Sequence, residues 1–251
     1  MNAEEPRLYT DLADWYHLLT APSEYAEEAS FFLRLFTEAL GTPPNTLLEL
    51  GCGGGNMASH YKRVVPQVTL TDRAPQMLAL SERLNPECEH LCGDMRTLQL
   101  GRHFDAVLAH DAVCYLTTPA DLREAMATAY LHCRPGGVAI FAPDHVREKF
   151  GDSVECGGED DVQRRLRYLM WTWDPDPGDE TYVVDFAYLL HEDGQPVRSV
   201  YDRHVHGLFT RATWLGLLTE VGFEQVVVHP LEHSEVAPDS VDVFVAIKPK
   251  R

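Results

Sequence analysis

The sequence predicts an α/β fold with a doubly wound, mostly parallel sheet of seven strands and a three-stranded antiparallel insertion. Apolar, strand-like runs alternate with amphipathic helical runs along most of the chain. The connections between these runs are short, as in right-handed β–α–β crossovers. Residues 163–208 break the alternation, because three β-rich runs follow one another there without a helix. The parallel core is therefore expected to be interrupted and then completed near the end of the chain.

The first expected element is a helix that begins at Ser23, in "SEYAEEASFFLRLFTEAL". An N-cap residue, acids in the first turn and apolar residues at helical spacing predict it, and Gly41-Thr-Pro-Pro ends it. Five strands and three helices then alternate. The strands are expected at 46–50, 67–72, 88–94, 104–110 and 137–144, and the helices at 55–64, 74–84 and 119–132.

The insertion consists of "RRLRYLMWTWD", "ETYVVDFAYLLHE" and "VRSVYDRHVHGLF", separated by the turn segments "PDPGD" and "DGQP". Such runs predict an antiparallel meander. A helix at 211–221 and strands at 223–229 and 240–249 follow. We therefore expect one domain made of residues 1–150 and 209–251, and a β insertion over residues 151–208.

Composition narrows the classes of partner. Among the 251 residues, 21 Lys and Arg stand against 39 Asp and Glu, a net charge of −18 that repels phosphate backbones and anionic lipids. No apolar run reaches the ~18 residues of a membrane span, and the acidic start of the chain differs from a signal peptide. We expect a cytoplasmic protein with reduced cysteines, no nucleic-acid or membrane partner, and a small-molecule substrate.

The stretch "LLELGCGGGN", Leu47 to Asn56, places four glycines within five positions after a buried strand. A bare turn between strand and helix lets backbone N–H groups approach a ligand. No Gly-Lys-Ser/Thr follows, which excludes a Walker loop, and Asn56 stands where a dinucleotide fingerprint has its third glycine. A tight turn without a ligand is the alternative interpretation of this stretch.

The acid and glycines at Glu49, Gly51, Gly53 and Gly55 resemble motif I of the class I S-adenosylmethionine-dependent methyltransferases. Two more acids follow at consecutive strand ends, Asp72 and Asp94. The resemblance covers residues 45–145 and implies a Rossmann-like methyltransferase sheet with S-adenosylmethionine as cofactor. It implies that Glu49 helps to hold the cofactor's ammonium group, that Asp72 bridges the ribose hydroxyls, and that Asp94 accepts from the adenine amino group. The expected cofactor-binding residues are completed by Tyr9, Arg73, Met77, Met95 and His110.

The segment "YTDLADWYHLL" is similar to an N-terminal tyrosine segment that folds over the cofactor in many small-molecule methyltransferases. Tyr9 and Tyr16 are its candidates, with plain aromatic packing as the alternative. The insertion is similar to the sheet that covers the acceptor site in the deoxyamino-sugar N-methyltransferases. Other small-molecule N-methyltransferases carry comparable sheets, so the acceptor, an amine or amino sugar among the candidates, stays open, as does a homodimer.

The expected reaction is direct in-line methyl transfer to N or O of a small molecule. His110 and Asp111 follow the strand at 104–110, at the sheet edge where such folds bind ligands, and with Tyr16 they are the catalytic candidates. His110 could instead cap the strand, and His145 is a lesser candidate. The alternatives are a cofactor-binding module without turnover and an NAD-dependent reductase.

Two alternating patterns in the insertion have more than one interpretation. Asp202, His204 and His206 share one face of a strand and could bind metal or acceptor, although such a face is most often solvated. We predict no metal. Trp171 and Trp173 likewise share a face, where they could wall the acceptor pocket or pack the insertion against the core.

Overall fold

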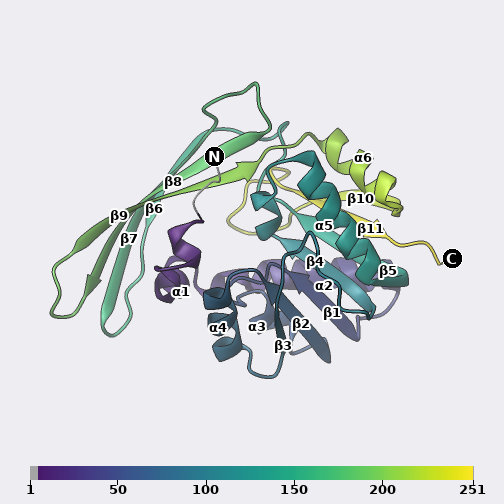
Figure 1. The fold of residues 1–251 in the computed structure, drawn as a ribbon, viewed down its shortest axis with the longest axis horizontal. Coiled ribbons are helices and arrows are strands. Elements are labelled where there is room, and N and C mark those ends of the chain that lie inside the picture. Colours follow the sequence, from purple (N-terminus) through teal and green to yellow (C-terminus); the bar gives the residue numbers. More distant parts are fainter. Residues whose placement is uncertain (1–4, 251) are drawn as a thin grey trace.

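The computed structural model describes residues 5–250, which form two sheets (Figure 1). The larger sheet has seven strands in the order β10-β11-β5-β4-β1-β2-β3, and the smaller, antiparallel sheet has the order β6-β7-β8-β9. The strands are β1 Thr46–Leu50, β2 Gln67–Asp72, β3 Glu89–Cys92, β4 Phe104–His110, β5 Cys133–Ala142, β6 Ser153–Gly157, β7 Arg164–Trp173, β8 Thr181–Glu192, β9 Arg198–Gly207, β10 Glu224–Pro230 and β11 Asp242–Ile247. The helices are α1 Tyr16–Leu19, α2 Ala26–Leu40, α3 Ala58–Tyr61, α4 Pro75–Leu84, α5 Pro119–His132 and α6 Arg211–Val221, with short 3₁₀ helices η1 Arg7–Tyr9, η2 Ala13–Trp15, η3 Pro22–Tyr25 and η4 Ala112–Tyr115.

The parallel part of the large sheet is centred on β1, which pairs with β2 on one side and β4 on the other. Strands β3 and β5 extend it in parallel, and β11 and β10 close one end in antiparallel orientation. The predicted doubly wound, mostly parallel sheet is thus confirmed. The carboxyl ends of five parallel strands lie at one edge, so the loops that follow them meet there.

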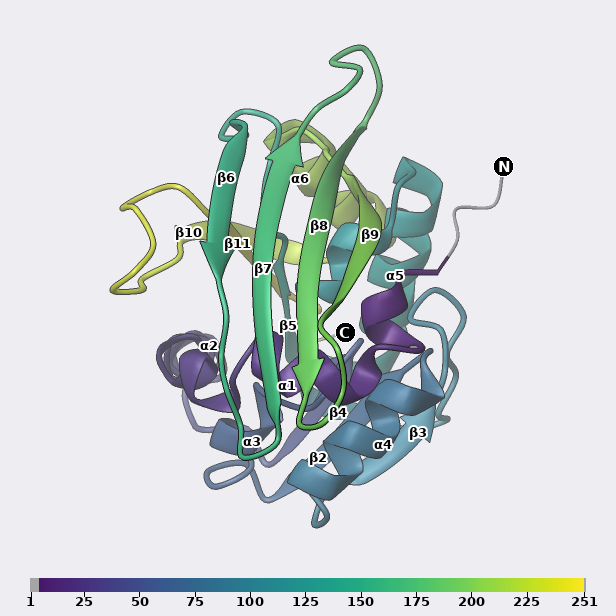
Figure 2. The same ribbon diagram turned by 90° about the vertical axis from the view of Figure 1, so that its left-hand side faces the viewer.

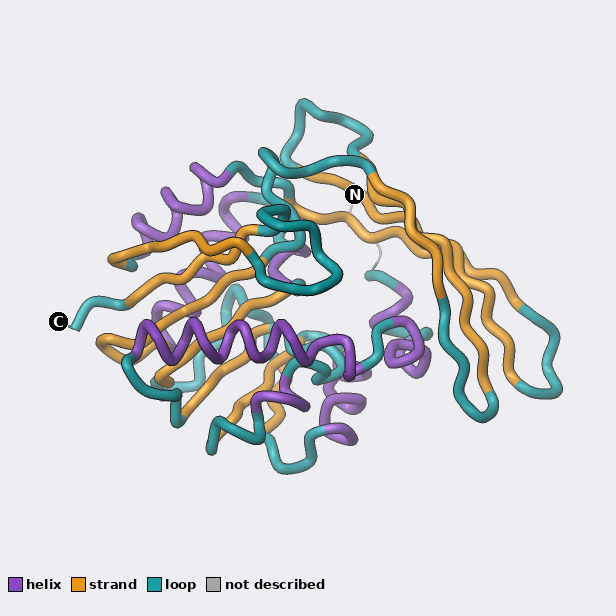
Figure 3. The backbone as a smooth tube through the Cα atoms, turned by 180° about the vertical axis from the view of Figure 1, so that it is seen from behind, coloured by secondary structure: helices purple, strands orange, loops and turns teal. Residues whose placement is uncertain are grey.

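Alternation along the strands distributes apolar side chains to both faces of this sheet. Val107 and Ala109 of β4 pack with α5 and α6, whereas Ala106 and Leu108 pack with α2 and α3. Figure 3 shows the long helix α2 crossing one face, and Figure 1 shows α5 and α6 on the other. Because both faces are covered, the central strands are apolar almost throughout, which explains the continuous apolar runs in the sequence.

Two expectations about elements were wrong. The helix expected at 55–64 is only the four residues of α3, because the glycine turn continues to Gly55, whose φ is +79°. The insertion has four strands rather than three: β6 pairs with β7 from Ser153↔Thr172 to Gly157↔Tyr168. All five residues of β6 are exposed, so the segment shows no apolar alternation that would have revealed it.

The four strands β6–β9, here called the roof sheet, stand across the carboxyl edge of the large sheet (Figures 1 and 2). The N-terminal segment, residues 5–20, lies beneath the roof sheet. Its residues Leu12, Trp15 and Leu18 pack against inward-facing roof residues such as Tyr182 and Val184. This apolar contact holds the roof sheet over the loops at the sheet edge.

Within the described residues, no helix is both long and apolar enough to cross a membrane. All six cysteines are free thiols.

Candidate functional site

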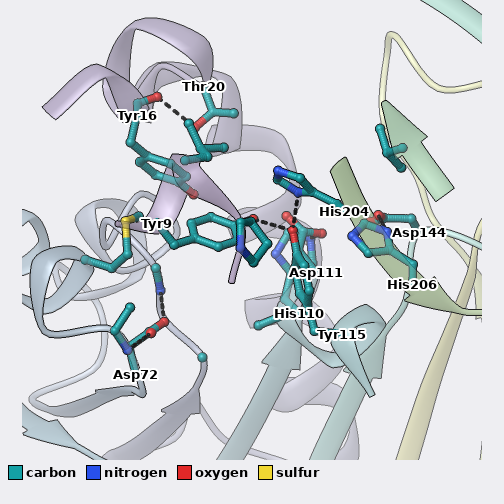
Figure 4. A pocket seen from close by; sticks show the side chains of 18 of the residues that line it. Tyr9, Tyr16, Thr20, Asp72, His110, Asp111, Tyr115, Asp144, His204 and His206 are labelled. Atoms are coloured by element: carbon teal, nitrogen blue, oxygen red, sulfur yellow. Dashed lines mark hydrogen bonds and ion pairs between the residues drawn. The ribbon is translucent and has the colours of Figure 1, made fainter. Parts of the chain in front are cut away.

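A cavity of about 640 Å³ lies between the carboxyl edge of the parallel strands, the N-terminal segment and the roof sheet (Figure 4). It is lined by every expected site residue except Gly55. Those lining residues are Tyr9, Tyr16, Glu49, Gly51, Gly53, Asp72, Arg73, Met77, Asp94, Met95, His110 and Asp111. The structure therefore brings into one hollow residues that are spread over a hundred positions of the chain.

The glycine turn between β1 and α3 forms one wall of the cavity. Gly51 has a φ of +78°, and a Cβ there would lie 2.3 Å from the Cβ of Ala112 and 2.8 Å from the Cε of Met95. The N–H groups of Gly51 and Cys52 both donate to the carbonyl of Thr71, each at 2.8 Å, and tie the turn to β2. Any side chain at position 51 would fill the space between β1 and η4, so the turn presents bare backbone to a ligand.

Glu49, at the end of β1, is buried and accepts a hydrogen bond from the hydroxyl of Tyr61. Burial raises the pKa of Glu49 to about 7, against the hydrogen bond from Tyr61, which lowers it. A ligand cation beside this carboxylate would favour its ionised form. The assignment of Glu49 to the ammonium group of an amino-acid tail stays a prediction.

Asp72 ends β2 and fixes the backbone around it. Its Oδ2 accepts from the N–H of Gly53 and its Oδ1 from the N–H of Ala74, both at 2.8 Å. Burial raises the pKa of Asp72, and the two amide bonds act in the opposite direction. A carboxylate oxygen can accept two hydrogen bonds, so each oxygen of Asp72 can still accept one from a sugar hydroxyl. The assignment to a ribose stays a prediction.

Asp94 forms a bidentate pair with Arg96, whose Nη2 lies 2.6 Å from its Oδ2. The hydrogen bond from Arg96 lowers the pKa of Asp94. Met77 is buried in the wall next to the glycine turn, and Arg73 is paired with Glu5 at 2.5 Å. Asp94 lines the cavity as expected, but an adenine amino group would have to share the carboxylate with Arg96. Its role in adenine binding stays a prediction.

His110 is buried at the end of β4 between two carboxylates. Its Nε2 lies 2.9 Å from Oδ1 of Asp111 and 3.2 Å from Oε2 of Glu28. Burial by itself lowers the pKa of His110, but the charges of Asp111 and Glu28 outweigh it and hold the pKa well above the ordinary value. The raised pKa favours the protonated imidazolium, which donates hydrogen bonds to the two carboxylates. In that form His110 cannot accept a proton as a general base.

Asp111 has an unusual backbone, with φ at +46° and ψ at −57°. Its N–H donates to the carbonyl of Ala142, which joins the ends of β4 and β5. A non-glycine residue in this region is strained, and such strain is concentrated at functional sites. Asp111 remains one of the proposed catalytic residues.

The two tyrosines of the N-terminal segment close the cavity over the glycine turn. The Oη of Tyr16 lies 3.2 Å from where a Cβ of Gly53 would be, and the rings of Tyr9 and Tyr16 are 6.3 Å apart. Burial raises the pKa of both hydroxyls, so both are neutral donors and acceptors. The segment lies over the glycine turn, and the expectation that Tyr9 and Tyr16 cover the cofactor stays a prediction.

Sequence reasoning missed Asp144, which follows β5 at the same sheet edge. Burial and the nearby charge of Asp111 raise the pKa of Asp144 to about 8. Potential ligand atoms of Asp144, Cys114 and His206 lie within 4.8 Å of one another, an arrangement that could hold a metal ion. The signal was available, since "FAPDH" places an acid two positions after β5, at the same sheet edge where Asp72 ends β2. The neighbouring His145 also lines the cavity, where burial lowers its pKa.

The prediction that Asp202, His204 and His206 lie on a solvent-exposed strand face was wrong, because all three side chains are buried. The N-terminal segment and η4 cover the inner face of the roof sheet, so the face that alternation predicts is turned inward. His204 and His206 line the cavity. Nδ1 of His206 bonds to the hydroxyl of Tyr182 at 2.9 Å, and burial lowers the pKa of His206 to about 3.

Tyr115 is a second residue that the sequence did not reveal. Its hydroxyl lies 2.7 Å from that of Tyr9 and 2.6 Å from Nδ1 of His204 (Figure 4). Nε2 of His204 in turn lies 3.1 Å from Oδ2 of Asp202. The short helix η4 presents Tyr115, and the pattern "AVCYL" gives no hint of it, because it reads as core packing.

Trp171 and Trp173 lie on the outer face of the roof sheet. They stack on each other with ring centroids 4.7 Å apart, and Nε1 of Trp173 donates to Asp185. Neither lines the cavity, so the hypothesis that they wall the acceptor pocket was wrong. The neighbours on the same strand, Met170 and Thr172, point inward instead and line it.

Comparisons with known proteins show which families this chain resembles. Residues 48–141 match the family model described as methyltransferase domain. The chain is 28% identical to a dTDP-3-amino-3,4,6-trideoxy-alpha-D-glucopyranose N,N-dimethyltransferase of Streptomyces venezuelae, over 94% of this chain and 98% of the relative. It is 25% identical to a dTDP-4-amino-2,3,4,6-tetradeoxy-D-glucose N,N-dimethyltransferase of Saccharopolyspora spinosa, over 98% and 96% of the two chains.

Two solved structures share the whole architecture. The crystal structure of Streptomyces venezuelae DesVI superposes with a TM-score of 0.81 at 26% identity, covering 96% of this chain and 98% of that one. The S-adenosylmethionine-bound CalS10, an amino pentose methyltransferase from Micromonospora echinaspora, superposes with a TM-score of 0.77 at 25% identity, covering 95% and 97%.

Proposed function

This chain carries a class I, S-adenosylmethionine-dependent methyltransferase domain, and on that premise we propose that it methylates the amino nitrogen of an amino sugar. The two sequence relatives named above are N,N-dimethyltransferases of dTDP-linked amino sugars, and they align over nearly the whole chain, roof sheet included, as does the structure of DesVI. The observation that carries the proposal is the single cavity that extends from the glycine turn to the inner face of the roof sheet.

The cavity fits the two ligands at opposite ends. The bare turn at Gly51 and Gly53, with Glu49 and Asp72 beside it, would hold the amino-acid tail and ribose of S-adenosylmethionine. When bound, that cofactor supplies a methyl group already activated on a sulfonium sulfur. The remaining space, towards β8 and β9, would hold the acceptor. We accordingly propose that residues 1–150 and 209–251 bind the cofactor and that residues 151–208 cover the acceptor.

Charge favours an amine over a hydroxyl acceptor. Asp111 and Asp144 both line the cavity, and burial together with the charge of Asp111 raises the pKa of Asp144 even though the charge of His110 acts in the opposite direction. An acceptor ammonium placed there would be stabilised by both carboxylates. The chain would position this nitrogen in line with the methyl group and exclude water, since an amine needs only to lose a proton before it reacts.

The test is a methylation assay with the purified protein and S-adenosylmethionine. The dTDP-3-amino-3,4,6-trideoxy sugar, the matching sugar with a hydroxyl in place of the amine, and a simple phenol serve as acceptors. We expect mass increments of one and two methyl groups on the amine only. Calorimetry with S-adenosylhomocysteine and NAD accompanies the assay. Binding of NAD would favour a reductase, and cofactor binding without methylation of any acceptor would favour a non-catalytic module.

A homodimer and a cytoplasmic location stay predictions. In support of the dimer, the outer face of the roof sheet exposes large apolar side chains, among them Leu169, Trp171 and Leu189. Sedimentation of the protein and of a Trp171→Glu variant tests it, because a charge at the centre of that face should favour the monomer.

A further inference from the structure

The chain of hydrogen bonds that leads from the cavity into the roof sheet has a defined direction. Asp202 accepts the backbone N–H groups of Arg7 and Leu8 at 3.0 and 2.9 Å, and Nε2 of His204 lies 3.1 Å from its Oδ2. Burial raises the pKa of Asp202, but the hydrogen bonds from His204 and Arg7 outweigh burial and keep that pKa below its ordinary value. An ionised carboxylate only accepts, so the proton of His204 is on Nε2.

The tautomer of His204 fixes the rest of the chain. With Nε2 protonated, Nδ1 accepts, and the hydroxyl 2.6 Å away, that of Tyr115, is its donor. Tyr115 has a single proton, so its oxygen accepts from the hydroxyl of Tyr9 at 2.7 Å. The oxygen of Tyr9 thus has its lone pairs available to a donor in the cavity that both tyrosines line.

We propose that Tyr9, Tyr115 and His204 form a proton relay that removes a proton from the acceptor's ammonium group and stores it on His204, which Asp202 orients. This inference rests on the proposed function and assigns it a base. The arrangement follows the logic of a triad, in which a carboxylate fixes a histidine that acts on a hydroxyl. Here the hydroxyl belongs to a tyrosine that carries the proton and forms no covalent bond with the substrate.

The proton balance of each transfer is simple. The ammonium N–H donates to Oη of Tyr9, the Tyr9 proton moves to Tyr115, and the Tyr115 proton moves to Nδ1 of His204, so both tyrosines end neutral. The amine lone pair then forms the N–C bond as the S–C bond of the sulfonium breaks, with its electron pair left on sulfur. One proton is released per methyl group, and the imidazolium loses it to solvent between turnovers.

The relay is assembled only when three parts of the chain are docked. Tyr9 comes from η1, Tyr115 from η4 and His204 from β9, and the carboxylate that orients His204 also holds the backbone of η1. Among the described residues, the groups able to carry charge that lie next to His204 are Asp202 and His206 on its own strand, with Tyr9 and Tyr115. Tyr188 of β8 lies near Asp202. Docking of the N-terminal segment and assembly of the base are therefore the same event.

Tyr115→Phe and His204→Gln test the relay, with Tyr201→Phe as the matched control. Tyr201 is on the same strand as His204 but on the outer face, where its hydroxyl bonds to Asp185. The rate of methylation of the dTDP-3-amino-3,4,6-trideoxy sugar is measured between about pH 6 and about pH 9. Near neutral pH both relay variants should be slower by about tenfold or more, and they should recover towards the unsubstituted rate as the amine becomes free base. Affinity for S-adenosylhomocysteine, measured by calorimetry, should be unchanged, and Tyr201→Phe should behave like the unsubstituted protein.

A second readout is independent of turnover. With S-adenosylhomocysteine bound, addition of the amino sugar should protonate His204, which ¹⁵N NMR of the imidazole detects, and Tyr115→Phe should abolish this change. Equal loss of rate at every pH, or an unchanged pH profile in both variants, would overturn the relay while leaving the proposed function intact. Absence of any methylation by the unsubstituted protein would overturn both.

Discussion

Replacing Asp72 with alanine should weaken the fold and the binding of cofactor separately, because its carboxylate serves both. The variant leaves the N–H groups of Gly53 and Ala74 without their acceptor. An unsatisfied amide costs about 1–3 kcal/mol, and both groups lie beside a cavity that water can enter, so a total of about 2–3 kcal/mol is expected. For a domain of this size each kcal/mol lowers the melting temperature by about 2–4 °C, which gives a shift of about 4–12 °C.

The affinity of the same variant for S-adenosylhomocysteine should fall by about tenfold to about a hundredfold. That range corresponds to the loss of a charge-assisted hydrogen bond of about 1.5–3 kcal/mol to the ribose hydroxyls. Calorimetric titration measures it at a temperature where the variant is folded. Asp72→Asn, which keeps one acceptor oxygen, should be less destabilised than Asp72→Ala. Its affinity for S-adenosylhomocysteine should fall nearly as much as that of Asp72→Ala.

Asp105→Ala is the control for this experiment. Its Oδ2 also accepts two backbone N–H groups, those of Asn45 and Thr46 at 2.9 and 3.0 Å, but at the amino edge of the sheet, away from the cavity. The Asp105→Ala protein should be destabilised by a similar amount and bind S-adenosylhomocysteine with unchanged affinity. If Asp72→Ala kept full affinity, or if Asp105→Ala lost as much, the carboxylate at the end of β2 would not be a ligand of the ribose.

Three residues of the cavity wall, Gly51, Glu49 and His110, give the remaining predictions. Gly51→Ala, whose Cβ would collide with Ala112, should abolish detectable binding of S-adenosylhomocysteine in calorimetry. If this variant still bound S-adenosylhomocysteine, the glycine turn would not be part of the cofactor-binding site. Glu49, with its pKa at about 7, should release a proton when the cofactor's ammonium binds near that pH, which calorimetry in buffers of different ionisation enthalpy measures. Because this folded pKa lies above the ordinary value of 4.5, ionising Glu49 costs stability as pH rises from about 4.5 to about 7, so Glu49→Gln should flatten that part of the stability profile. The ion pairs of protonated His110 stabilise the fold fully at pH values below the ordinary pKa of 6.5, and this contribution is lost as pH rises through the raised pKa of the folded protein. Glu28→Gln should lower the pKa of His110, which an NMR titration measures. His110→Ala should reduce turnover more than cofactor affinity.

Much of the cavity wall was predictable because its residues follow local rules. Glu49 and Asp72 lie in the last two residues of their strands and Asp94 lies two positions after β3. Parallel strands end at the same edge, so sequence order alone places these acids near one another. The positive φ at Gly51, Gly53 and Gly55 likewise agrees with the need for glycine read from the motif. A cofactor edge built in this way can be recognised from spacing.

The acceptor side was not predictable, since its residues meet only through packing between distant segments. His204 lies 89 positions from Tyr115 and 195 from Tyr9, and nothing in the local pattern of β9 shows that its inner face is covered. Asp202 looked solvated for the same reason, because alternation states which side chains share a face and not which face is buried.

By itself, then, the sequence determined the order of strands and helices, the bare turn and the row of acids at the strand ends, all of which depend on contacts between near neighbours. Only the tertiary structure decided which face of the roof sheet is buried, that His110 is held between two carboxylates, and that a tyrosine of η4 meets a histidine of β9. These features arise when the N-terminal segment packs its apolar side chains beneath the roof sheet, and the free energy of that long-range burial is not encoded in any short stretch of the chain.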